Sequence, residues 1–218
     1  MQNLDPAVAA TWYVAFLLST TCHEAAHAWV AKLGGDLTAY HGGQVTLNPW
    51  PHIRREPFGM VVVPIISVLI SGWAFGWASA PYDPYWADRH PKRAGLMAAA
   101  GPAANALLCL LAVALLRVGA ATGMIGAGAG DSLAAASTQF LVTMAILNAL
   151  LGVFNLLPLP PLDGASIVEA FGGSTIRNAM RGFRALPIAG FVGILVAWNI
   201  FPILARPVYA LVQWLIAG

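Results

Sequence analysis

The sequence predicts an all-α polytopic membrane protein with about five to six transmembrane helices and a short re-entrant β-hairpin or loop after the first helix. The first observation is the composition: 59% of the 218 residues are hydrophobic and 9% are charged, against about 45–50% and 25% in soluble domains. The second is a mean hydropathy of +0.72. The third is a series of uncharged runs, each long enough for the roughly 20-residue helix that crosses a hydrocarbon core, over 57–82, 94–116, 132–162 and 185–205.

This composition excludes several classes of protein. The 11 Lys and Arg and 9 Asp and Glu residues are too few to cover the surface of a soluble domain of this size. An ordinary cytosolic domain, a disordered chain and a nucleic-acid-binding protein are therefore excluded, and the lipid bilayer is the expected surrounding. The net charge of +2 is too small to indicate an electrostatic partner. Any charge inside an apolar run then needs an explanation, because ionisable groups are costly within a bilayer.

The first predicted helix begins near Pro6 and continues to about Leu33, and it is apolar except for one polar cluster near its middle. Residues 34–56 contain Gly pairs, β-branched residues and turn signals, which predict a short hairpin or re-entrant loop. Within it, the strand character of 44–50 leads to the hypothesis that its edge binds an unwound substrate by strand addition. The uncharged run 57–82 then predicts a second span.

Further along, residues 81–93 predict an interfacial loop, with Tyr and Trp at the depth of the lipid headgroups. The Gly- and Ala-rich residues 119–131, between the next two predicted spans, predict a flexible loop. Residues 173–184 place Arg177, Arg181 and Arg184 at helical spacing beside apolar residues, which predicts a basic amphipathic helix on the membrane surface.

The C-terminal run after 185–205 is also uncharged, but the last twelve residues are too short to span a bilayer alone. We expect them to continue the preceding helix or to fold back from it, with Pro202 and Pro207 kinking the region. The whole chain, 1–218, is expected to form a single integral membrane domain. Its motif-bearing core covers about 7–171, and its C-terminal amphipathic and membrane helices cover 173–218.

The flanking residues predict how the chain sits in its membrane. The N-terminal segment has no basic region before its apolar run, so we expect no cleavable signal peptide. Basic residues are more frequent in the loops on the N-terminal side, which favours a cytoplasmic N-terminus in a bacterial or archaeal cell membrane. Cys22 and Cys109 both fall in predicted helices and are expected to be small buried hydrophobes, not a disulfide.

The polar cluster in the first helix reads His23-Glu24-Ala25-Ala26-His27, an H-E-x-x-H pattern. Positions i and i+4 lie on the same face of a helix, so both imidazoles can reach one ion. Glu24 lies to the side, close enough to act as general base without being a ligand, as in zinc-assisted hydrolysis. Chance or a structural polar contact is the competing interpretation. Either explanation could account for one ionisable residue inside a membrane span, but hardly for three on one helical turn.

A catalytic zinc ion usually has three protein ligands, and Asp163 is the leading candidate for the third. Pro158, Pro160 and Pro161 interrupt the helix just before it, and broken backbone at membrane depth is tolerated only where it is buried or lines a cavity. The alternative is that Asp163 merely caps a helix over 164–171. Glu169 is the weaker competitor for the ligand position.

Together these motifs resemble the site-2 protease family of intramembrane zinc metalloproteases. The resemblance rests on the following elements: HEAAH at 23–27, NLLPLPPLDG at 155–164, GPAAN at 101–105 and TLNPWPHI at 46–53. It implies an endopeptidase that cleaves substrate transmembrane segments in regulated intramembrane proteolysis, such as anti-sigma factors or signal-peptide remnants. It also implies a compact form, because 218 residues leave no room for the PDZ or CBS domain that some members carry.

The resemblance also assigns roles to residues. It implies that His23, His27 and Asp163 bind one Zn²⁺ and that Glu24 is the catalytic base. Asn155 would lie near the active site and help to hold substrate or an oxyanion. For Asn105 we weigh a substrate or oxyanion role against a hydrogen bond between helices, which the small residues around it would permit. A lone loop histidine, His52, is expected to make a polar contact more often than to bind metal.

Two rival functions remain at this point. One is a membrane zinc protease of another class, in which a helical Glu, here Glu169, is the third ligand. The other is a membrane protein with a structural or transport-related metal site and no peptidase activity. Glu24 argues against the second, because a closed structural site needs no base.

Overall fold

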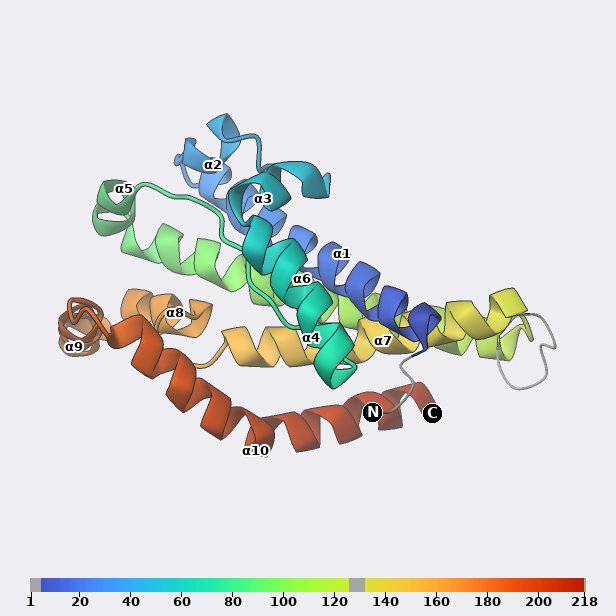
Figure 1. Ribbon diagram of the computed structural model, residues 1–218. Helices are drawn as coiled ribbons and strands as arrows, with labels where there is room; N and C mark the ends of the chain where they lie inside the picture. The colour runs from blue at the N-terminus through green and yellow to red at the C-terminus, as the bar shows by residue number, and fades with distance from the viewer. Residues whose placement is uncertain (1–4, 126–131, 218) are drawn as a thin grey trace.

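The computed structural model describes residues 5–125 and 132–217, and every regular element in these ranges is a helix (Figure 1). The six residues 126–131, which fall in the predicted Gly- and Ala-rich loop, lie outside the described residues. The elements in chain order are α1 (Pro6–Leu33), α2 (Thr38–His41), α3 (Pro49–Arg55), η1 (Phe58–Val62), α4 (Val63–Ser71), α5 (Pro84–Arg89), α6 (Pro91–Ala121), α7 (Ser132–Asn155), α8 (Asp163–Phe171), α9 (Gly173–Arg184) and α10 (Ala189–Ala217).

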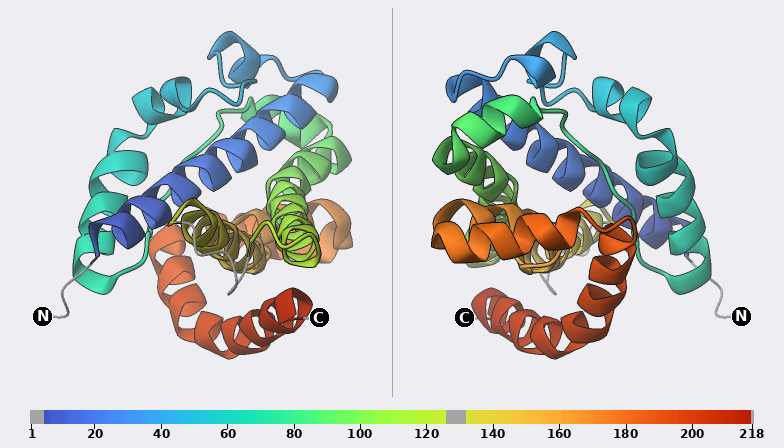
Figure 2. Two further views of the ribbon diagram at one scale, coloured as in Figure 1. Left: turned by 90° about the vertical axis from the view of Figure 1, so that its right-hand side faces the viewer. Right: turned by 90° about the vertical axis from the view of Figure 1, so that its left-hand side faces the viewer.

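The long helix α6 packs against α1, α7 and α8. One hydrophobic core fills the space between α1, α6 and α7, and it includes Phe16, Cys109 and Leu147. Figure 2 shows α10 curving along the side of the bundle opposite α1. The all-helical prediction is therefore confirmed for the described residues, and the helices that carry the sequence motifs meet in the middle of the fold.

Three helices are long and apolar enough to cross a membrane, namely α6, α7 and α10. Helix α1, with 28 residues, is of comparable length but carries the polar His and Glu cluster. α10 is continuous to Ala217, so the last uncharged run continues the helix before it. Pro202 and Pro207 lie inside α10, and Figure 2 shows the bend of this helix.

The predicted span over 57–82 is not a full span. Only Phe58–Ser71 is helical, about 21 Å at 1.5 Å per residue, against roughly 30 Å for the hydrocarbon core. Gly72 ends α4 in the left-handed conformation, with φ 80°, and its N–H bonds the carbonyl of Val68. An extended segment then returns along the bundle to α5 (Figure 1).

Of the two alternatives for 34–56, the re-entrant loop stays a prediction, but the hairpin is wrong, because this segment contains two short helices and no strand within the described residues. The reason is local capping. The side chain of Asn48 accepts a hydrogen bond from Trp50 N at 3.0 Å, and Pro49 occupies the first helical position, a combination that starts a helix. The strand-addition hypothesis for 44–50 therefore loses the strand on which it depended.

The predicted basic amphipathic helix over 173–184 is confirmed as a helix, α9. Its arginines do not form a free basic face, because they turn toward α8 and α5. Arg181 contacts Glu169 at 3.0 Å and Asp88 at 2.6 Å, and Arg184 lies 3.5 Å from Glu169. α9 is thus attached to α8 and α5 through the arginines that predicted its basic face.

Candidate metal centre

One turn of α1 presents a buried group of potential metal ligands. His23, Glu24 and His27 are 7%, 5% and 6% exposed, and one ligand atom from each lies within 4.8 Å of the others. The i, i+4 spacing places both imidazoles on the face of α1 that packs against α6. Three ionisable side chains thus converge inside the helical bundle.

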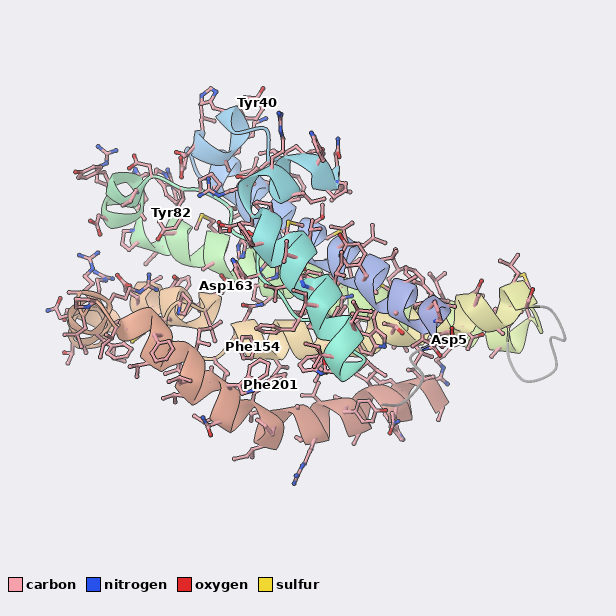
Figure 3. The ribbon with its side chains drawn as sticks, viewed as in Figure 1. Asp5, Tyr40, Tyr82, Phe154, Asp163 and Phe201 are labelled. Atoms are coloured by element: carbon pink, nitrogen blue, oxygen red, sulfur yellow. The ribbon has the colours of Figure 1, made fainter. Side chains whose placement is uncertain are left out.

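Asp163 approaches this group from a segment 140 residues away. Its Oδ2 lies 3.1 Å from Nε2 of His23, and its Oδ1 lies 3.4 Å from Nε2 of His27. Figure 3 shows Asp163 at the start of α8, next to α6. The capping alternative does not hold, because the N-cap of α8 is Leu162 and the Asp163 carboxylate turns to the histidines instead.

The local sequence explains how Asp163 reaches this position. α7 ends at Asn155, and the Pro-rich segment that follows does not continue the helix. Gly164 lets the start of α8 lie directly against the end of α7, because a Cβ there would overlap the carbonyls of Leu156 and Leu157. On the other side, Gly193 of α10 lets that helix contact the carbonyl of Pro160.

Backbone and amide acceptors determine which nitrogen of each histidine carries its proton. His27 Nδ1 lies 2.7 Å from the carbonyl of Met97, and His23 Nδ1 lies 2.6 Å from the amide oxygen of Asn105. Both partners only accept, so each neutral ring donates from Nδ1. The lone pair of each Nε2 then faces the other at 2.9 Å and also faces the Asp163 carboxylate. These electron-rich atoms need a positive charge between them, which either a metal ion or a proton on one Nε2 can supply.

The space between these atoms fits a metal ion. A Cβ at Gly101, on the facing side of α6, would overlap the Nε2 atoms of both histidines, so the absence of a side chain there keeps this space open. Two imidazoles and one carboxylate are a common donor set for catalytic zinc. Ligands tetrahedrally arranged around one zinc ion lie roughly 3.3–3.5 Å apart, close to the 2.9, 3.1 and 3.4 Å found here.

Glu24 differs from the two histidines in that its side chain makes no hydrogen bond to another described residue. It is nevertheless buried and adjacent to the histidine pair. A carboxylate with no hydrogen-bond partner among the described side chains, beside a group that can hold a metal, is available to accept a proton from a water molecule.

The remaining predicted residues lie outside this ligand group. Glu169 is engaged by the arginines of α9, which removes it as an alternative third ligand. Asn155 bonds Leu151 O within α7 at 3.1 Å, and its predicted role at the active site stays a prediction. His52 is buried and contacts the carbonyl of Thr46 at 3.1 Å, as expected for a loop histidine.

Asn105 is fully buried behind His23, and both ends of its amide are engaged. The expected alternative of a helix-to-helix hydrogen bond describes its contacts better than a substrate or oxyanion role, which needs a free polar atom. Sequence reasoning missed Asn148, its partner on α7. The signal for Asn148 was an amide in the middle of the uncharged run 132–162, where a polar side chain needs a partner.

Comparison with known proteins adds independent information. A family described as "Peptidase family M50" matches residues 116–200, a range that includes Asp163. The Bacillus subtilis (strain 168) protein named "Putative zinc metalloprotease YwhC" is 38% identical over 187 residues, 84% of this chain and 77% of that protein. The Mycolicibacterium smegmatis protein named "Putative zinc metalloprotease Rip2" is 28% identical over 199 residues, 91% of this chain and 70% of that protein. No solved structure gives a significant match.

Proposed function

The chain belongs to peptidase family M50, the site-2 protease family of zinc metalloproteases, and on that premise we propose that it is an intramembrane endopeptidase. It would cleave peptide bonds in or near the transmembrane segments of other membrane proteins. The observation that carries the proposal is the convergence of His23, His27 and Asp163 beside Glu24, inside a bundle whose long helices are apolar enough to span a membrane.

In this proposal the chain's own residues have distinct tasks. His23, His27 and Asp163 would hold the zinc ion. Bound there, zinc would supply Lewis-acid chemistry, because it polarises a carbonyl and makes water a better nucleophile near neutral pH. Glu24 would accept the proton of the attacking water at its carboxylate and pass that proton to the leaving amine. Asn155, at the C-terminal end of α7, would donate its amide N–H to the substrate or to the developing oxyanion.

The substrate must change conformation before it can react. The amide bonds of a transmembrane helix are hydrogen-bonded along the helix and shielded by side chains. A substrate segment therefore has to unwind locally so that one carbonyl reaches the ligand group. Membrane-anchored regulators such as anti-sigma factors, or signal-peptide remnants, are the proposed substrates in regulated proteolysis, on the basis of the family alone.

The unengaged Glu24 favours a peptidase over a structural or transport-related metal site, since those sites need no general base. We expect Glu24→Gln to keep its zinc and to cleave a fluorescently labelled transmembrane peptide about 10²–10⁴-fold more slowly than the wild type. The measurement compares initial rates in detergent at equal zinc content. Glu56→Gln is the control, because the Glu56 carboxylate accepts a hydrogen bond from Ser79 and an amide oxygen can do the same. Equal rates for wild type and Glu24→Gln would refute the proposed mechanism.

A further inference from the structure

A chain of buried polar side chains begins at His23 and leads away from the ligand group through three helices. Asn105 of α6 contacts His23 Nδ1 at 2.6 Å and donates to Asn148 Oδ1 of α7 at 2.8 Å. Asn148 in turn donates to Ser19 Oγ of α1 at 2.8 Å. All three residues are 0% exposed. Buried amides with complete partners in an apolar bundle tend to specify one arrangement, since any other leaves them unpaired.

One backbone carbonyl determines which atom donates and which accepts in the hydrogen bonds that link His23, Asn105 and Asn148. The amide of Asn148 lies 2.9 Å from the carbonyl oxygen of Met144, which can only accept, so the Asn148 atom there must be Nδ2. Its Oδ1 therefore faces α6 and accepts from Asn105 Nδ2. This leaves Oδ1 of Asn105 facing His23, so His23 must donate from Nδ1 and keep the lone pair on Nε2.

One face of α6 thereby determines which nitrogen of each histidine carries the proton. Met97, Gly101 and Asn105 follow one another at intervals of four residues, so they lie along one side of the helix. The first and last accept the Nδ1–H groups of His27 and His23, and Gly101 between them leaves the space in front of both Nε2 atoms open. The histidines belong to α1, but their proton positions are determined by α6 and, through Asn148, by α7.

We propose that Asn105 and Asn148 are positioning residues that hold His23 with its proton on Nδ1 and its Nε2 directed at the metal position. The proposal rests on the proposed function only in taking the ion to be zinc. Neither residue would touch the substrate. Partners of this kind behind a ligating histidine typically account for a 10–100-fold difference in metal affinity.

The test measures zinc affinity by chelator competition on the purified protein in detergent, without substrate. We expect Asn105→Leu to weaken zinc binding roughly 10–100-fold and Asn148→Leu to weaken it roughly tenfold. Asn105→Asp should weaken zinc binding less than Asn105→Leu does, because its carboxylate still accepts the His23 Nδ1–H although it can no longer donate to Asn148 Oδ1. Thr143→Val is the matched control: Thr143 is 2% exposed on the same helix as Asn148 but is no part of the hydrogen-bond chain.

A second measurement remains decisive if one Leu variant does not fold. The visible absorption of the cobalt(II)-loaded protein reports ligand geometry, and Asn105→Asp should preserve the wild-type spectrum. The proposal is overturned if Asn105→Leu binds zinc as tightly as Thr143→Val, or if Asn105→Asp loses zinc as completely as Asn105→Leu. The failure of this proposal and the failure of the proposed function give different results. If zinc affinity depends on Asn105 and Asn148 as expected but the wild type cleaves no peptide, only the peptidase activity is refuted.

Discussion

At the scale of single residues, the ligand group depends on three side chains that point at one another and on a glycine that has no side chain. His23 and His27 direct lone pairs toward the Asp163 carboxylate, and Gly101 leaves the space between them unfilled. Glu169 was the rival to Asp163, but its carboxylate is taken by Arg181 and Arg184 of α9. Each of these contacts leads to a prediction about zinc binding by a variant.

Asp163→Ala should reduce the zinc content of the purified protein to a small fraction of one ion per chain, because it leaves only the two histidines as ligands. Glu169→Ala is the comparison, and it should retain the wild-type zinc content. Metal analysis by mass spectrometry after gel filtration checks both. Full zinc content in Asp163→Ala would show that another residue completes the ligand set.

Gly101→Ala should abolish zinc binding, since the new Cβ would overlap the Nε2 atoms of both histidines. Gly190→Ala is the matched control, because a Cβ at that position meets no neighbouring atom within 4 Å. It should bind zinc normally and be slightly more stable, as Ala favours a helix over Gly by roughly 1 kcal/mol. Isothermal titration with zinc distinguishes the two variants, and tight binding by Gly101→Ala would contradict the deduced metal position.

At the scale of elements, short polar contacts at the helix ends hold the framework around the ligand group. α9 is joined to α8 and α5 through Arg181. The loop after α1 is joined to the start of α5 through Asp36, which accepts from Thr38 Oγ1 at 2.6 Å, Thr38 N at 2.9 Å and Asp83 N at 2.9 Å. These contacts are made by polar residues at helix ends, which the uncharged runs of the sequence do not predict.

Asp36 makes the stability of this corner dependent on pH. Burial raises the pKa of its carboxyl group, but the hydrogen bonds from Thr38 and Asp83 outweigh burial and hold the pKa below its usual value of 3.8. A carboxylate with a lowered pKa stabilises the fold above its unfolded-state pKa, and this contribution is lost as the pH falls through the folded-state pKa.

Asp36→Ala should therefore lower the free energy of unfolding at pH 7 by about 1–3 kcal/mol, and the difference from the wild type should shrink as the pH falls below about 4. Denaturant unfolding at several pH values measures this. Asp5→Asn is the control, because Asp5 caps α1 and Asn caps a helix about as well as Asp. A pH-independent difference would mean that the Asp36 charge contributes nothing.

At the scale of the whole molecule, the ligand group joins parts of the chain that are otherwise held together by apolar packing. His23 and His27 come from the first helix, whereas Asp163 follows α7, the second of the candidate spans α6, α7 and α10. A bound ion would therefore cross-link α1 to α8 across the face of α6. Binding to the folded state alone stabilises it, by about 4 kcal/mol when the free ligand exceeds its Kd about 1,000-fold.

Removing zinc with a chelator should accordingly lower the Tm of the wild-type protein in detergent by several degrees, and zinc in excess of the chelator should restore it. The same treatment should leave the Tm of Asp163→Ala nearly unchanged, because that variant has no complete ligand set. Thermal unfolding followed by circular dichroism measures both proteins. An equal shift in the two would place the stabilising metal elsewhere.

The sequence by itself was enough for the features that depend on neighbours along the chain. Composition indicated the membrane, uncharged runs indicated α6, α7 and α10, and the spacing of HEAAH placed two histidines on one face of α1. Each is a property of one helix or one run. Local rules failed where capping competed with composition, as at Asn48 before α3 and at Gly72 after α4.

Only the tertiary structure decided which distant side chains meet. It brought Asp163 within 3.1 Å of His23, paired Glu169 with α9 and placed Asn105 behind His23 with Asn148 as its partner. The physical reason is that a buried polar group must find its partner among all the helices that pack around it. That choice depends on how close two helices approach, and small residues such as Gly101 and Gly164 determine the approach only once the helices are assembled.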